Sequence, residues 1–140
     1  IGLNSTAPGE VGGFLAESEL QRLESCLMHH PDVPAVVALH HPPVRLGSRW
    51  LDAIGLAEPE RFFAVTDRFE QIRAVLFGHA HQAYTQKCRG VLLVGAPATS
   101  AQFLPRSDEF AMDDRPPGWH VLTLAGDGDV QSTFRWLDRA

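Results

Sequence analysis

The sequence predicts an α/β fold in which buried strands alternate with helices. Runs of mainly apolar residues at 35–39, 73–77 and 91–94 are typical of short strands covered on both faces of a sheet. Leucines at helical spacing predict one helix before the first run. A segment that opens with proline predicts a second helix between the first run and the second. With 140 residues, 44% of them hydrophobic, we expect one domain spanning residues 1–140 with a real core.

The first 34 residues are expected to contain one irregular segment and one helix. Residues 1–16 are rich in glycine and proline, and the helix is predicted from Glu17 to about His29. Acidic residues occupy its first turn, where they suit the helix dipole, and Pro31 follows its end. The leucines at helical spacing are Leu20, Leu23 and Leu27.

Loops and a hairpin are expected in the remaining chain. Residues 42–57 are predicted to form a long loop, and residues 59–70 a helix that starts at proline. Residues 97–118 form a long, partly acidic connection, and such connections are often functional. Residues 119–125 and 130–137 are predicted to pair as a hairpin across a Gly-Asp-Gly-Asp turn. The helical phenylalanines expected to enter the core are Phe62, Phe63 and Phe69.

The composition of the chain excludes some classes of binding partner. The formal net charge is -5 and no lysine or arginine cluster occurs, so we expect no nucleic-acid polymer as a partner. No apolar stretch approaches the roughly 20 residues of a membrane-spanning helix, so we expect no membrane partner. Cys26 and Cys88 form no C-x-x-C motif, which favours reduced thiols in a cytoplasmic protein. Because Ile1 is not methionine and begins a segment typical of a protein interior, we expect a fragment.

Histidines follow two of the predicted strands. Residues 78–81 (Gly-His-Ala-His) come directly after the run at 73–77, and His40 comes after the run at 35–39. Side chains two residues apart on an extended backbone point the same way, so His79 and His81 are expected to aim at one place. Neutral histidine is the commonest protein ligand for metals. This pattern predicts half of a binuclear metal site.

These motifs resemble the second half of the calcineurin-like metallophosphoesterase signature. Segments 8–13, 40–43, 47–52 and 102–103 further resemble bacterial class III cyclic-AMP phosphodiesterases, and the likeness covers essentially the whole chain. The resemblance implies half of a two-sheet metallophosphoesterase sandwich: a mixed sheet with flanking helices and a C-terminal β-hairpin. It also implies hydrolysis of cyclic AMP to AMP with two divalent metal ions, of which iron or manganese is expected.

The resemblance also implies a role for individual residues. His40 and His79 would bind one ion, and His81 would bind the other. We expect His41 to support a neighbouring ligand or contact substrate rather than bind metal directly. Arg49 and Trp50 lie in the following loop and are equally well explained by substrate contact or by plain packing.

The chain also departs from the family pattern. It contains no D-x-H and no Gly-Asn-His, so we expect the C-terminal portion of a metallophosphoesterase domain whose N-terminal half is absent. No residue of this chain is assigned as catalytic, and we expect it to be inactive alone. Half a sandwich leaves one apolar sheet face uncovered, which predicts self-association. The alternatives are a phosphodiesterase for another phosphodiester, and a non-catalytic metal-binding or dimerisation module derived from the family.

Overall fold

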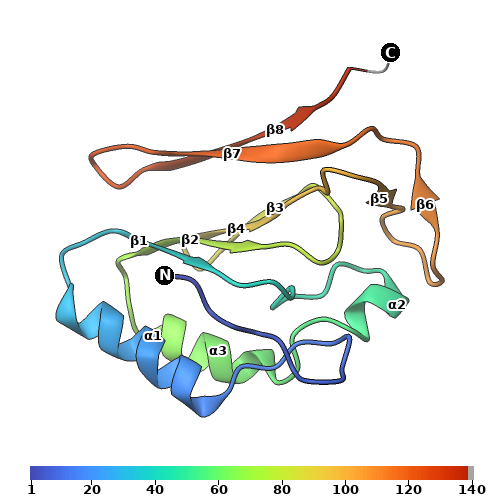
Figure 1. The fold of residues 1–140 in the computed structure, drawn as a ribbon. Helices are drawn as coiled ribbons and strands as arrows, with labels where there is room; N and C mark the ends of the chain where they lie inside the picture. The colour runs from blue at the N-terminus through green and yellow to red at the C-terminus, as the bar shows by residue number, and fades with distance from the viewer. Residues whose placement is uncertain (139–140) are drawn as a thin grey trace.

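The computed structural model describes residues 1–138 and is built around a four-stranded mixed sheet (Figure 1). Strands β1 and β2 pair in parallel, β2 and β4 pair in parallel, and β3 joins β4 antiparallel, which gives the order β1-β2-β4-β3. The predicted strands are confirmed. β3 was not predicted, because its middle residues are polar and exposed. The strands are β1 (Ala35–Ala38), β2 (Ile72–Phe77), β3 (Tyr84–Cys88) and β4 (Val91–Gly95).

Two helices lie together on one side of this sheet (Figure 1). Helix α1 (Glu17–His29) has the predicted bounds and buries all three of its periodic leucines. Helix α3 (Pro59–Thr66) starts at the predicted proline but ends four residues early, because the chain then turns tightly, with the amide of Phe69 donating to the carbonyl of Thr66. Phe62 is only 1% exposed and Phe63 and Phe69 pack against the same core, as predicted.

The predicted loop at residues 42–57 contains one helical turn, α2 (Arg49–Asp52), so the prediction of a loop throughout was wrong. The Asp52 side chain accepts a hydrogen bond from the amide of Leu46 at 2.7 Å. This bond folds the loop back on itself and stabilises the turn. Sequence periodicity cannot reveal an element of four residues, because it spans barely one helical turn.

The opposite side of the sheet faces a hairpin of β7 (Gly118–Leu124) and β8 (Val130–Trp136), which confirms the predicted hairpin (Figure 1). Its residues alternate between half-buried and exposed, and Trp119 and Val121 lie on the exposed face. The hairpin therefore lies over the face that was expected to be bare, while presenting apolar side chains of its own. Self-association through this side stays a prediction.

The long connection at residues 97–118 contains a short antiparallel pair, β5 (Gln102–Phe103) and β6 (Met112–Asp113). Gln102 is fully buried and organises it. Its amide nitrogen donates to the carbonyls of Ala98 and Pro116, and its amide oxygen accepts from the Ala98 amide. The sequence showed this connection only as long and acidic, whereas in the structure the buried side chain of Gln102 holds it together.

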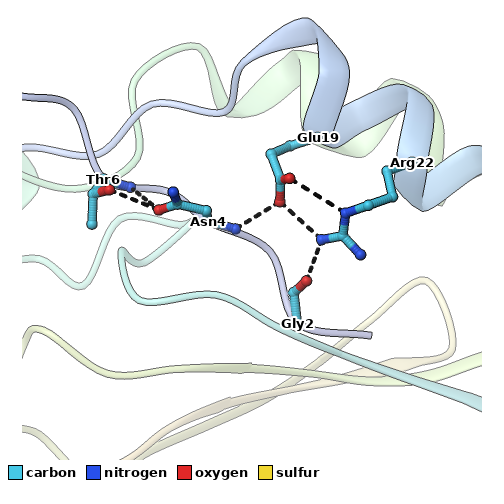
Figure 2. Close-up of polar contacts among 5 residues, drawn as sticks. All are labelled: Gly2, Asn4, Thr6, Glu19 and Arg22. Atoms are coloured by element: carbon cyan, nitrogen blue, oxygen red, sulfur yellow. Dashed lines mark hydrogen bonds and ion pairs between the residues drawn. The ribbon is translucent and has the colours of Figure 1, made fainter.

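The irregular N-terminal segment is fixed to both β1 and α1. The amide of Leu3 donates to the carbonyl of Ala38, which continues the sheet at its β1 edge. Figure 2 shows the second attachment: Glu19 accepts from the amide of Asn4 at 2.7 Å and from Arg22. Arg22 also donates to the carbonyl of Gly2. These bonds place the following residues of the segment over the end of β1.

No helix among residues 1–138 is long and apolar enough to cross a membrane. Both cysteines have free thiols, with Cys26 in α1 and Cys88 at the end of β3.

Candidate metal centre

Three histidine rings meet at the carboxyl ends of two neighbouring parallel strands. His40 and His41 come just after β1, and His79 comes just after β2. The amide of Gly78 donates to the carbonyl of His40 at 3.0 Å, which holds the two strand ends together. One ring nitrogen from each histidine lies within 4.8 Å of the others. Within residues 1–138 this is the one group of histidine, cysteine or acidic side chains gathered closely enough to hold an ion.

The donor atoms of two of these rings fit a shared metal ion. His40 Nε2 and His79 Nδ1 face each other at 3.2 Å. Two histidine nitrogens on one tetrahedral ion, each at about 2.1 Å, lie about 3.4 Å apart. His40 is exposed, so an ion can approach from solvent. The spacing, the donor type and the access agree with a site for a divalent cation.

His79 is held in the neutral form that binds metals. Burial, and then the neighbouring rings of His41 and His40, lowers its pKa to about 4. Its Nε2 atom is buried and has no hydrogen-bond partner. A buried Nε2 without a partner also occurs at His120, so this feature does not by itself mark a functional residue.

The backbone after β2 differs from the one expected. β2 ends at Phe77, and both His79 (φ 62°) and His81 (φ 49°) have left-handed backbone conformations. The expectation of an extended backbone through both histidines was therefore wrong, whereas a shared site for the two rings stays a prediction. Positive φ at a residue other than glycine is uncommon and costs about 1–3 kcal/mol, and such strain is often found at functional sites.

His81 lies outside the group of three rings. Its Nδ1 donates to the carbonyl of Ala101 at 2.9 Å, and its ring stacks parallel on Phe103 with centroids 4.4 Å apart. A neutral imidazole that carries its proton on Nδ1 keeps a lone pair on Nε2, which is the state a metal ligand needs. The role of His81 as ligand to a second ion stays a prediction.

The two weaker candidates lie on α2. Trp50 packs edge-on against Phe103 and Phe110, with centroids 5.2 and 5.4 Å away, and its indole nitrogen is buried without a partner. Arg49 is exposed and lies 3.9 Å from the carboxylate of Asp108, a contact that solvent screens strongly. Both therefore make packing or surface contacts, and substrate contact by either stays a prediction.

His41 completes the group but differs from the other two rings. It is only 4% exposed, and burial lowers its pKa below the ordinary value. Its Nδ1 lies 2.9 Å from the hydroxyl of Ser5, and its Nε2 lies 3.2 Å from the carbonyl of Val11. Sequence reasoning assigned no role to Ser5. No local pattern could have done so, because Ser5 and His41 are separated by 36 residues.

The fold matches part of a solved structure. A crystal structure of a dimetal phosphatase from Danio rerio superposes with a TM-score of 0.53, covering 86% of this chain and 38% of the phosphatase at 16% identity. The chain therefore has the fold of part of a metallophosphatase. No protein-family model matches the sequence.

Proteins related in sequence point to a more specific group of enzymes. The 3',5'-cyclic adenosine monophosphate phosphodiesterase CpdA of Vibrio vulnificus is 36% identical over 135 residues, which is 96% of this chain and 49% of the relative. A 3',5'-cyclic-nucleotide phosphodiesterase of Nostoc is 40% identical over 126 residues, which is 90% of this chain and 47% of the relative. The chain is thus homologous to bacterial cyclic-nucleotide phosphodiesterases of the CpdA type, over about half of their length.

Proposed function

We propose that this chain forms part of a metal-dependent phosphodiester hydrolase that converts cyclic AMP to AMP, with His40, His79 and His81 as metal ligands. The observation that carries the proposal is the facing pair of His40 and His79 nitrogens, 3.2 Å apart at the ends of two parallel strands. Homology to cyclic-nucleotide phosphodiesterases supports the substrate class. Open α/β sheets commonly bind ligands at the carboxyl ends of their strands, which supports the location.

Each histidine has a distinct task in this proposal. His40 Nε2 and His79 Nδ1 would hold one divalent ion between them. The carbonyl of Ala101 and the face of Phe103 would hold the His81 ring so that its Nε2 is directed to a second ion. When bound, the divalent ions would bind phosphate oxygens and lower the pKa of a water molecule, which is the usual contribution of a two-metal site to phosphodiester hydrolysis.

The proposed site needs more ligands than this group of rings supplies. Three neutral imidazoles bring no negative charge, and no carboxylate lies in the group formed within residues 1–138. Two divalent ions brought together without anionic ligands would repel each other strongly. We therefore propose that the chain binds metal but does not turn over substrate alone. The same observation keeps a second candidate open, a metal-binding module without catalysis.

A paired assay separates these candidates. The 140-residue chain is assayed with cyclic AMP and added Mn²⁺, with a metal count on the same sample. A chimera in which this chain replaces the matching half of the Vibrio vulnificus relative is assayed in parallel. We expect metal binding without turnover in the chain, and hydrolysis of cyclic AMP in the chimera.

Variants and substrates make the assay decisive. His81→Ala in the chimera should abolish hydrolysis, with His120→Phe, which lies in the hairpin, as the matched control. A folded, metal-loaded chimera that hydrolyses bis-p-nitrophenyl phosphate but not cyclic AMP would favour another substrate. A folded chimera that binds metal and hydrolyses neither compound would favour the non-catalytic module.

A further inference from the structure

We infer that Ser5 is a positioning residue for the metal centre: its hydroxyl fixes the His41 ring in one tautomer, and His41 then supports His40 and His79 instead of binding metal itself. The inference rests on the proposed function. It assigns different roles to three histidines whose ring nitrogens lie within 4.8 Å of one another.

The hydroxyl of Ser5 has a complete set of partners. It lies 3.2 Å from the amide nitrogen of His40 and 3.3 Å from that of His41, and both amides donate to it. A serine hydroxyl has two acceptor sites and one proton. Because the amides use both acceptor sites, the proton is donated to His41 Nδ1, 2.9 Å away. Ser5 is 1% exposed, so water does not compete for these bonds.

The second nitrogen of His41 selects the same tautomer independently. Nε2 lies 3.2 Å from the carbonyl oxygen of Val11, which can only accept a hydrogen bond. Nε2 therefore carries the ring proton, and Nδ1 is the acceptor that Ser5 requires. Both nitrogens of the neutral ring are then occupied. No lone pair of His41 is left for a metal ion.

The contacts around the His41 ring also fix its position. A Cβ atom added to Gly13 would lie 2.3 Å from His41 Cγ, so the bare glycine backbone lies directly against the imidazole. The ring also contacts those of His79 and His40, with centroids 4.6 and 4.9 Å away. His41 thus occupies the space between the N-terminal segment and the proposed ligands, and its position sets theirs.

The segment that carries Ser5 is anchored independently of the histidines. The amide of Phe14 donates to the carbonyl of Ser5 at 3.0 Å. On the other side, Asn4 is bound to Glu19 of α1 (Figure 2). Thr6, drawn in the same figure, donates its hydroxyl proton to Asn4 Oδ1 at 2.7 Å and is exposed. Thr6 provides a matched control, because no hydrogen bond connects its hydroxyl to a histidine.

The test compares Ser5→Ala with Thr6→Ala in the 140-residue chain. Long-range ¹H–¹⁵N spectra of the imidazoles, recorded without metal, report the tautomer of each histidine. Titration with Co²⁺ alone, followed by its visible absorption, reports affinity. In the unmodified chain we expect His41 as the Nε2–H tautomer. In Ser5→Ala the Val11 carbonyl is the one remaining group that selects the tautomer, so the preference should weaken and the Nδ1–H form should become populated. Co²⁺ should bind about 10- to 100-fold more weakly, as is typical when a residue that orients metal ligands is removed. Thr6→Ala should match the unmodified chain.

Several outcomes would overturn the inference. One is an Nδ1–H tautomer of His41 in the unmodified chain, and another is an unchanged tautomer and Co²⁺ affinity in Ser5→Ala. If Ser5→Ala does not fold, Ser5→Cys keeps the shape with a weaker hydrogen-bonding group and should show a smaller loss of the tautomer preference. Only the tautomer is compared in this variant, because a thiol can itself bind Co²⁺. Failure of every form to bind Co²⁺ would contradict the proposed metal centre, whereas the tautomer measured without metal would still decide the role of Ser5.

Discussion

His41 in the strand-end group of histidines is buried and His120 in the terminal hairpin is half-buried, and the two rings differ in how completely their nitrogens are bonded. His41 has partners for both ring nitrogens, whereas His120 in β7 has a buried Nε2 without one. Burial lowers the pKa of both rings. A lowered pKa therefore does not by itself mark a site. The fixed partners and the neighbouring rings distinguish His41 from a histidine that is simply covered.

The two regions also differ in how their strands are covered. β2 and β4 contain residues buried almost completely between helices and neighbouring strands, whereas β7 and β8 are half-buried on one face only. The sheet should therefore carry most of the stability, and it also holds the proposed metal centre. The proposed metal centre and most of the stability are therefore expected in the same part of the chain.

The largest effect should come from the core beneath the sheet. Phe62→Ala removes a ring that is 1% exposed and should lower the free energy of unfolding by about 3–5 kcal/mol. Phe134→Ala in the half-buried hairpin should lower it by less than half as much, because the ring retains contact with water. Urea unfolding midpoints measure both. Equal losses would show that the hairpin is as tightly packed as the sheet.

The next effect should come from the close contact at Gly13. Gly13→Ala places a Cβ atom 2.3 Å from His41 Cγ, so the ring must move, at about 1–3 kcal/mol of stability and with weaker Co²⁺ binding. Gly12→Ala is the matched control, because its nearest neighbouring atom would be 3.6 Å away, an ordinary contact. Thermal unfolding and Co²⁺ titration measure the pair. Similar results for both variants would contradict the confinement of His41.

A smaller effect should depend on pH. Folding lowers the pKa of His120, so the unfolded chain binds a proton at this ring more readily than the folded chain does. The contribution of His120 to the free energy of unfolding is therefore fully present above the ordinary pKa of about 6.5 and is lost as the pH falls below it. His120→Phe should remove this contribution and therefore lose less stability than the unmodified chain when the pH falls from about 7.5 to about 5.5. Urea unfolding at the two pH values measures the difference. If both chains lose the same free energy of unfolding, His120 is protonated equally well in the folded and the unfolded state.

The smallest effect should come from the contacts in Figure 2. Arg22 and Glu19 form an ion pair at 2.9 Å, and their side chains are 44% and 22% exposed. Arg22→Ala should therefore lower the free energy of unfolding by no more than about 1 kcal/mol, and by less at high salt. Unfolding at low and high ionic strength measures it. A larger, salt-independent loss would mean that α1 and the N-terminal segment depend on each other more than exposed contacts allow.

Periodicity and apolar runs were sufficient to predict the main elements. Leu20, Leu23 and Leu27 predicted α1 with its observed ends, and the apolar runs predicted β1, β2 and β4. β3 and α2 were missed because their residues carry no periodic signal: β3 is mostly exposed, and α2 is a single turn. The end of α3 was misplaced because local turns after Thr66 override the continuing helical pattern.

The candidate site could be predicted in part. The sequence placed His40 and His79 at strand ends, and the parallel pairing of those strands brings them together. It did not predict the left-handed backbone at His79 and His81. Nor could it predict the contacts of Ser5 and Gly13 with His41, because these exist only once distant segments have folded against each other.

The parallel pairing of β1 with β2 has a consequence for the order of folding. Val36 pairs with Ala74, so this contact closes a long loop, whereas β7 and β8 are joined by a short turn. Hairpins form in about 1–10 μs, and long-range parallel pairing is intrinsically slower. The facing nitrogens of His40 and His79 therefore come together late, after the hairpin. In a refolding experiment, the appearance of the cobalt absorption band would mark the slow closure of the sheet.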